Sequence, residues 1–342
     1  ALLPAAYETL VLDKLTVMAS ATLASTTEPV ATSAACVLFT SGSTGIPKAV
    51  LLEHGGLTHY VQQLARETDV TAKSKVLQFA SLNFDISIEE MFVAFAGGAT
   101  LVLRELGPAP SIAEFIEFCK TRHISWVSLP TAYWNEWTAQ LGCWDDLHTV
   151  IIGGEKVLLE NWRRWQRILG SRVQLLNTYG PTEASIAATW FELTHQKPDS
   201  RHDIPIGRPL PGVVVYVLDA QRRSQPHGVP GDLYIGGFGV ARGYLGQESE
   251  AFSANPFAAG RLYNTGDRGR YLADGNIEYL GRADEQIKLR GHRLEPAETA
   301  AALLEHPAVD NCVVLARAIA SNNDSPLALI AWCVTSETIA SA

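Results

Sequence analysis

Long apolar runs are absent from this 342-residue sequence. A helix that crosses a membrane needs roughly 18 or more apolar residues in a row, and no run in the chain reaches that length. The first residues, ALLPAAYETLVLD, also lack the basic segment and the cleavage pattern of a secretory signal. The sequence therefore predicts no membrane partner.

Cysteine and histidine patterns of metal sites and disulfide frameworks are missing as well. The five cysteines are far apart, and none belongs to a C-x-x-C pair. The nine histidines form neither an H-x-x-x-H nor an H-E-x-x-H pattern. A disulfide framework and a zinc site are therefore not indicated, and a cytoplasmic location is expected.

Basic residues are fewer than acidic ones. The chain has 27 Lys and Arg against 36 Asp and Glu, a formal charge of −9, which argues against a nucleic-acid partner. Hydrophobic residues make up 47% of the chain, as in ordinary globular proteins. A chain of this length can bury a large core and is expected to hold more than one folding unit.

Residues 37–52, VLFTSGSTGIPKAVLL, are the most informative stretch. The flanking apolar residues predict a strand, a loop and a second strand. Glycines and hydroxyl residues in the loop can direct several N–H groups and hydroxyls into one concavity, which fits a polyphosphate, and Lys48 adds a positive charge. A Walker loop counted from Gly42 would need Gly and Ser or Thr where the chain has Pro47 and Ala49, so this is a different loop.

Strand and helix patterns alternate along the first half of the chain. Helices are expected at 55–68, 86–95, 111–121, 132–141 and 159–169, and strands at 8–14, 75–80, 99–103, 124–128, 149–152 and 173–177. This alternation predicts a parallel sheet covered by helices. From residue 206, short β segments at 213–218, 232–235, 270–272 and 277–279 predict a β-rich layer or a small barrel. A small α+β unit is expected after residues 282–284, with a β segment at 286–289, a helix at 297–305 and a strand at 309–316.

Five segments, taken together and in this order, resemble motifs of the adenylate-forming enzymes. This superfamily comprises acyl-CoA synthetases, luciferases and the adenylation domains of nonribosomal peptide synthetases. The segments are SGSTGIPK at 41–48, NFDISIEEMF at 83–92, NTYGPTE at 177–183, TGD at 265–267 and GNIEYLGRADEQIKLRGHR at 275–293.

The resemblance implies roles for individual residues. It assigns phosphate binding and catalysis to Thr40, Ser41, Ser43, Thr44 and Lys48, adenine contacts to Asn177 and Tyr179, the α-phosphate to Thr182, and Mg²⁺ to Glu183. It also assigns nucleotide contacts to Gly154, ribose contacts to Asp267 and Tyr279, and contacts with both ribose and phosphates to Arg282. In the C-terminal part, it makes Asp284 the pivot and gives Lys288 a role in the active site after the small domain rotates. The residue types suit these roles, because a hard cation prefers a carboxylate and a carboxylate can accept two hydrogen bonds from a cis-diol.

Asp85 separates the members of this superfamily. The segment at 83–92 resembles the wall of the amino-acid pocket in peptide synthetase adenylation domains, where an aspartate meets the α-ammonium group. A buried carboxylate without a cationic partner is unfavourable by several kcal/mol, so Asp85 favours an amino-acid substrate. The alternative is that Asp85 is the N-cap of a helix that begins at Ile86.

The remaining pocket positions suggest a substrate side chain. Phe84 lies beside them, and by resemblance the positions are Asp85, Ile86, Glu89, Ser128, Ile151, Gly153, Thr178, Ile186 and Ala187. Glu89 follows Asp85 by one helical turn, so that both carboxylates share a face. Two anions in an apolar pocket repel each other unless each finds a cation, which favours a diamino acid such as lysine or ornithine, or a β-isomer. The alternative is a solvated Glu89 beside Glu90.

A glycine-rich segment at 236–243, GGFGVARG, could be mistaken for a dinucleotide fingerprint. Three residues rather than two precede its last glycine, and no helix pattern follows. We expect a strand followed by a glycine-rich turn, which matches a non-catalytic part of the family, V-x-x-G-Y.

These observations predict an α/β protein with a large domain of parallel-type sheets, helices and a β-rich layer. Residues 1–283 would form a partial large adenylation domain and residues 284–342 a partial small α+β subdomain, with a hinge at Asp284. The upstream part of the family's large domain is expected to be missing before Ala1, and the small domain to end before the family's catalytic lysine.

The predicted activity is formation of aminoacyl-AMP from an amino acid and ATP with Mg²⁺. Transfer to the phosphopantetheine thiol of a peptidyl carrier domain would follow, with a condensation domain as a further partner. The alternatives are an acyl- or aryl-CoA ligase of the same superfamily and a non-catalytic nucleotide-binding fragment.

Overall fold

The structure is a computed structural model of the chain. It describes residues 29–42, 47–104, 107–140, 142–196, 203–284, 286–289, 292–318 and 327–335. The strand predicted at residues 8–14 lies outside this part.

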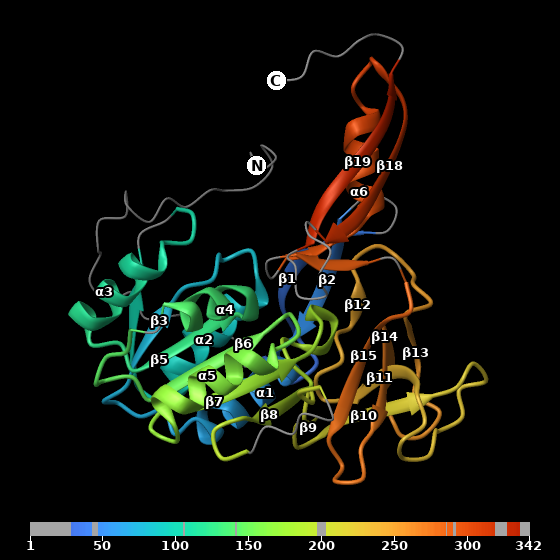
Figure 1. Ribbon diagram of the computed structural model, residues 1–342. Coiled ribbons are helices and arrows are strands. Elements are labelled where there is room, and N and C mark those ends of the chain that lie inside the picture. The colour runs from blue at the N-terminus through green and yellow to red at the C-terminus, as the bar shows by residue number, and fades with distance from the viewer. Residues whose placement is uncertain are drawn as a thin grey trace, which may run out of the picture.

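A seven-stranded sheet forms the centre of the larger half (Figure 1). Its strands are β3 (Lys75–Gln78), β4 (Thr100–Leu103), β5 (Trp126–Pro130), β6 (Thr149–Gly153), β7 (Gln174–Tyr179), β8 (Thr189–Glu192) and β9 (Arg208–Pro209). Their order is β4-β3-β5-β6-β7-β8-β9, and the five strands from β4 to β7 are parallel. The predicted parallel sheet is confirmed, whereas β8 and β9, which no pattern indicated, continue it antiparallel.

Helices cover both faces of this sheet. The helices are α1 (His54–Glu67), α2 (Asp85–Ala96), α3 (Ile112–Arg122), α4 (Thr131–Ala139) and α5 (Leu159–Leu169). Side chains alternate between the faces of a strand, so Val76 packs in the cluster that holds α1 and α2, and its neighbour Leu77 packs with α3, α4 and α5. Helix α3 begins with a capping box, in which Ser111 and Glu114 are bonded to each other's backbone N–H groups.

Two antiparallel sheets adjoin this α/β core. The first joins β1 (Ala34–Thr40), β2 (Lys48–Glu53) and β12 (Gly243–Tyr244), and the β1–β2 register sets Thr40 opposite Lys48. The second contains β10 (Val213–Leu218), β11 (Gly231–Gly237), β13 (Phe252–Ala254), β14 (Arg261–Tyr271) and β15 (Ile277–Arg282). Its order, β10-β11-β14-β13 with β15 on β14, is that of a layer, which was one of the two predicted alternatives.

The C-terminal elements project beyond these layers in Figure 1. They are β16 (Ile287–Leu289), β17 (His292–Leu294), α6 (Pro296–Leu304), β18 (Val309–Ala318) and β19 (Leu327–Thr335). β16 pairs with β17, and β18 pairs with β19, so that Cys312 lies directly opposite Cys333. Both cysteines are free thiols.

Tryptophan is concentrated in the α/β half of the molecule. Six of the eight tryptophans are buried in or beside the central sheet, namely Trp126, Trp134, Trp137, Trp144, Trp162 and Trp165. Trp137 packs against both Trp144 and Trp165, with ring centroids 5.6 and 5.2 Å apart. Trp332 in β19, by contrast, is 51% exposed.

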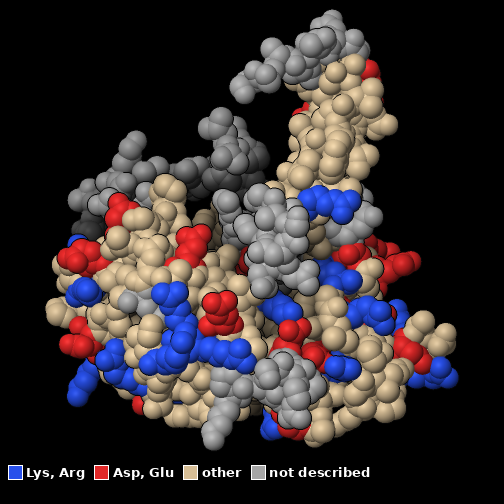
Figure 2. Space-filling model, in the orientation of Figure 1, with Lys and Arg blue, Asp and Glu red and all other residues tan. Residues whose placement is uncertain are grey.

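Acidic and basic side chains are interspersed over the face shown in Figure 2. Within the described ranges, no helix is both long and apolar enough to span a membrane.

Candidate active site

A cavity of about 630 Å³ lies at the carboxyl edge of the parallel strands. Its wall includes residues at the ends of β5, β6 and β7 and in the connection from β3 to α2. Because each parallel strand leads into its connection at this edge, open α/β sheets commonly bind ligands there. The fold therefore gathers residues that are far apart in the sequence.

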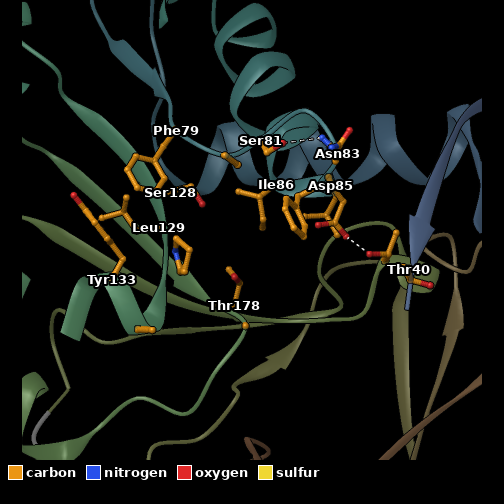
Figure 3. Close-up of a pocket in the computed structure, with 18 of the residues that line it drawn as sticks. Thr40, Phe79, Ser81, Asn83, Asp85, Ile86, Ser128, Leu129, Tyr133 and Thr178 are labelled. Carbon is orange, nitrogen blue, oxygen red and sulfur yellow. Dashed lines mark hydrogen bonds between the residues drawn. The ribbon is translucent and has the colours of Figure 1, made fainter. Parts of the chain in front are cut away.

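Many of the residues predicted to bind substrates meet on this wall. They are Thr40, Ser41, Phe84, Asp85, Ile86, Ser128, Gly153, Gly154, Thr178, Thr182, Ile186, Asp267 and Arg282. Figure 3 shows Phe79, Leu129 and Tyr133 towards one end and Asp85 and Thr40 towards the other, with Ile86, Ser128 and Thr178 between them. The cavity thus has an aromatic and aliphatic end and a polar end.

Hydroxyl groups mark the polar end. The side-chain oxygen of Thr40 is buried and has no hydrogen-bond partner within the described ranges. Buried hydroxyls are normally bonded, so this oxygen is suited to a ligand that brings a polar group. Ser43 and Thr44, also predicted for phosphate, lie outside the described residues.

Asp85 occupies the first turn of α2 rather than its N-cap. The N-cap is Phe84, and no side chain caps the helix. Asp85 Oδ2 instead accepts a hydrogen bond of 2.7 Å from the Thr182 hydroxyl. The alternative of a helix N-cap is therefore wrong, and the predicted ammonium-binding residue contacts the residue predicted for the α-phosphate.

Glu183 is fully buried behind this end of the cavity. Its Oε1 accepts a hydrogen bond of 2.7 Å from the Tyr244 hydroxyl. Lys48 Nζ lies 5.4 Å from the centroid of the same tyrosine ring. Neither Lys48 nor Glu183 lies on the cavity wall, although both are close to residues that do.

Asp267 is the centre of a buried hydrogen-bond cluster. Its carboxylate accepts bonds from the Tyr179 hydroxyl at 2.6 Å, the Tyr279 hydroxyl at 3.4 Å and Arg282 Nη1 at 2.9 Å. Burial, together with the Asp267 charge, raises the pKa of both tyrosines, which therefore remain neutral donors. Four residues predicted for the nucleoside thus lie together. Asn177 lies apart from this cluster, buried, with its amide bonded to the Pro205 carbonyl.

Glu89 is fully buried, so the alternative of a solvated helix residue is wrong. Its Oε2 accepts a hydrogen bond from the Tyr60 hydroxyl of α1, and its Oε1 has no partner in the described part of the chain. Burial raises the pKa of Glu89 to about 7, opposed by the nearby hydroxyls of Tyr60 and Ser128. Ser128 lies on the cavity wall, whereas Glu89, Ile151 and Ala187 lie behind it.

Glu90 has a role that was not predicted from the sequence. This side chain is also fully buried, and its carboxylate accepts bonds from the Ala80 N–H at 3.1 and 3.2 Å and from Gln78 Nε2 at 3.3 Å. Burial raises its pKa to about 8. Glu90 therefore fixes the start of the β3–α2 connection, whose residues line the cavity.

Tyr60 and Tyr244 were also missed. They lie 29 and 61 residues from the glutamates that they contact. The sequence offered one general signal, a glutamate among apolar residues, because a carboxylate that becomes buried needs a hydrogen-bond donor. That signal does not say which distant residue supplies the donor. Lys288, predicted to act after rotation, has its backbone in β16, but its side chain lies outside what the structure describes.

Oxygen ligands for Mg²⁺ are limited to a few side chains. No group of three or more His, Cys, Asp or Glu residues that could hold a metal ion occurs in the described ranges. Mg²⁺ in nucleotide enzymes usually takes only one or two carboxylates and completes its shell with phosphates and water. The Glu183 carboxylate, next in sequence to the Thr182 hydroxyl on the wall, fits that pattern.

The chain is similar to several known proteins. A profile of the family described as "AMP-binding enzyme" matches residues 4–245. The chain is 44% identical over 291 residues to a component of the linear gramicidin synthase of Brevibacillus parabrevis, a match that covers 83% of this chain and 4% of that protein. It is 41% identical over 293 residues to isonitrile lipopeptide synthase of Streptomyces coeruleorubidus, covering 82% of this chain and 19% of that protein.

A solved structure shares the fold. It is an artificially fused adenylation and PCP di-domain of a nonribosomal peptide synthetase from Klebsiella oxytoca, with a TM-score of 0.78 and 26% identity. The alignment covers 90% of this chain and 62% of that one. The chain therefore spans only a small part of the curated relatives and under two thirds of this structure.

Proposed function

This chain belongs to the AMP-binding enzyme family, and from that premise we propose that it activates an amino acid as aminoacyl-AMP within a nonribosomal peptide synthetase. In this reaction a carboxylate oxygen of the amino acid attacks the α-phosphorus of ATP. A bond forms between the carboxylate oxygen and the α-phosphorus, the bond between the α-phosphorus and the α–β bridging oxygen breaks, and pyrophosphate leaves. The observation that carries the proposal is the contact of Asp85 with Thr182 inside one cavity.

The contact between Asp85 and Thr182 supports the proposal that the substrate carboxylate and the α-phosphate of ATP lie close together. The α-ammonium of an amino acid held by Asp85 brings the neighbouring carboxylate close to a phosphate at Thr182. Holding two reactants at attack distance accounts for a large part of many enzymatic accelerations. A CoA ligase for simple acids has no ammonium for Asp85, so an amino-acid substrate is favoured over that alternative.

The phosphate end is proposed to act electrostatically. Thr40 and Ser41 supply hydroxyls on the wall, and Lys48 supplies a positive charge from the facing strand. Fixed donors and charges stabilise the charge that develops in phosphoryl chemistry without reorganisation. Mg²⁺, held by Glu183, would neutralise charge on the phosphates.

The nucleoside is proposed to bind at the Asp267 cluster. A ribose cis-diol can donate two bonds to one carboxylate, and Asp267 lies on the cavity wall. Tyr179 and Tyr279 have ring centroids 6.1 Å apart beside it and offer aromatic surface for adenine.

We propose a diamino acid, such as lysine or ornithine or a β-isomer, as the substrate. The support is Glu89, a buried carboxylate with one oxygen bonded to Tyr60 and the other without a partner within the described ranges. A buried carboxylate is stabilised by a cation. A second ammonium group on the substrate would supply this cation if it displaced the Ser128 hydroxyl from beside Glu89.

A carrier domain is proposed as the recipient of the aminoacyl group, through its phosphopantetheine thiol, with a condensation domain as a further partner. The supporting comparison is the fused adenylation and PCP protein. Residues 284–342 are proposed to form a small subdomain that turns about Asp284 between the two half-reactions.

The test is pyrophosphate exchange by the full-length protein across a panel of amino acids and simple carboxylic acids. Exchange that depends on an amino acid supports the proposal, and a diamino acid should give the highest rate. Exchange with simple acids alone would support a CoA ligase, and ATP binding without exchange would support a non-catalytic role. If a neutral amino acid wins and Glu89→Gln leaves the preference unchanged, the diamino-acid proposal is wrong.

A further inference from the structure

The glycine-rich segment after β11 has a contact that its structural role does not require. The predicted strand and turn are present, since β11 ends at Gly237 and the chain then runs to the short strand β12. β12 pairs with β2, which sets Tyr244 opposite Val50. Tyr244 is 8% exposed and lies between two residues predicted to act on the phosphates.

Its hydroxyl and its ring make different contacts. The hydroxyl donates to Glu183 Oε1 at 2.7 Å, and the ring lies 5.4 Å from Lys48 Nζ. The sheet explains the second contact, because residues two apart on a strand share a face. Lys48 lies two residues before Val50 on β2, and so on the side of the sheet where Val50 meets Tyr244.

Further contacts hold Glu183 and the Tyr244 ring in place. The Glu183 carbonyl accepts a backbone bond of 2.9 Å from Ala241, three residues before Tyr244. The Tyr244 ring also packs edge-on against Phe252, with centroids 5.3 Å apart. Glu183 and Tyr244 are therefore joined through backbone and side chain, and the tyrosine ring has little freedom to turn.

We propose that Tyr244 is a positioning residue that sets the Glu183 carboxylate and the Lys48 ammonium at a fixed separation for Mg·ATP. The hydroxyl holds one carboxylate oxygen and so restricts rotation of Glu183, and the ring provides a cation–π surface for Lys48. This inference rests on the proposed function. It adds to that function a residue outside the cavity wall, which acts through the two charged groups and touches neither substrate.

The experiment compares Tyr244→Phe and Tyr244→Leu in the full-length protein. Tyr271→Phe is the matched control, because its hydroxyl donates a bond of similar length, 2.8 Å, to the Val215 carbonyl within the β layer. ATP affinity is measured by calorimetry with and without Mg²⁺, and Tm is recorded for each variant. The concentration of Mg²⁺ at half-maximal pyrophosphate exchange is a second readout.

Without Mg²⁺, Tyr244→Phe should bind ATP as tightly as the original protein. With Mg²⁺, its ATP affinity should be about tenfold lower than that of the original protein, which is the loss expected for one hydrogen bond to a charged group. Its half-maximal Mg²⁺ concentration should rise by a similar factor. Tyr244→Leu should also weaken ATP binding without Mg²⁺ by a few-fold, because Lys48 loses the aromatic surface. Both Tyr244→Phe and Tyr271→Phe should keep a cooperative thermal transition, with the lower Tm in Tyr244→Phe, because its lost bond goes to a buried carboxylate.

Two results would overturn the proposal. One is a Tyr244→Phe protein that behaves like Tyr271→Phe in both affinities. The other is an equal loss of affinity with and without Mg²⁺, which would indicate general damage to the site. Failure of the unmodified protein to bind ATP would contradict the proposed function itself, so the two failures are distinguishable.

Discussion

Arg282 Nη1 lies 2.9 Å from Asp267 Oδ1 at the end of the cavity predicted for ribose. The other side of the same guanidinium donates to Asp284 at 2.5 and 2.6 Å. Asp284 Oδ1 also accepts a bond of 3.1 Å from the Gln286 N–H. The predicted pivot is therefore linked to the predicted ribose site through one side chain, that of Arg282.

The first prediction concerns this pivot. Asp284→Pro should spare adenylate formation and damage thiolation, because proline fixes φ near −65° and restricts rotation of the backbone. Asp284→Ala is the control, since it removes the carboxylate and leaves the backbone free. The measurements are pyrophosphate exchange and loading of the carrier domain. Equal losses in both half-reactions for Asp284→Pro would contradict the hinge.

The second prediction concerns charge at the phosphate end. Lys48→Ala and Glu183→Gln should each lower the turnover number for adenylate formation by on the order of 10² to 10³, as for removal of one preorganised electrostatic group. Single-turnover formation of the adenylate measures the effect without product release. Unchanged rates in both variants would remove the phosphate and Mg²⁺ assignments together.

The third prediction is a pH dependence of substrate affinity. The pKa of Glu89 is raised to about 7 without a ligand, and a second ammonium group on the substrate binds only the ionised carboxylate. The Kd for a diamino acid should therefore rise about tenfold for each pH unit below 7 and level off above it. Glu89→Gln should bind more weakly and show a flat profile between pH 5.5 and 8. A sloping profile in that variant would assign the dependence to another group.

The fourth prediction concerns stability and Glu90. Its pKa is raised from 4.5 to about 8 in the folded chain, so between these values the folded state binds more protons than the unfolded state. Stability should therefore fall as pH rises from 5 to 8, by a few kcal/mol at about 1.4 kcal/mol per pKa unit. Glu90→Gln should remove nearly all of this fall between pH 7 and 8 and about half of it between pH 5 and 7, where Glu89, with its pKa raised to about 7, contributes the rest.

Thermal unfolding at several pH values measures how Glu90 affects the stability of the folded chain. Glu117→Gln, a substitution of an exposed glutamate on α3, is the control and should keep the pH dependence of the original chain. If Glu90→Gln and Glu117→Gln follow the same curve, Glu90 is not the titrating group.

Local patterns predicted most of the α/β half. The helix at 159–169 has the bounds that its apolar spacing indicated, and the strand predicted at 149–152 extends by a single residue, to Gly153. Hydrophobic period and turn residues are local, so they are visible without tertiary contacts. The short strands β8, β9 and β12 were missed because pairing with distant strands, rather than their own composition, defines them.

The site was predicted in part for the same reason. Motif residues such as Asp85, Thr182 and Asp267 were identified because each lies in a recognisable segment, and they share one cavity wall. The burial of Glu89 and the contact of Tyr244 with Glu183 depend on packing between segments far apart in the sequence. No local pattern reports such contacts.

The distribution of tryptophan provides a built-in optical probe of two parts of the chain, the central α/β core and the C-terminal hairpin. The six buried indoles of the central sheet are shielded from a collisional quencher such as iodide, whereas the 51% exposed ring of Trp332 in β19 is accessible to it. The quenchable part of the emission therefore comes mainly from the C-terminal hairpin, with a smaller share from the partly buried Trp190, and the unquenched part comes from the core beside the cavity. With Trp332→Phe as the reference, a change in quenching upon adding ATP would follow the C-terminal hairpin in solution without an attached label.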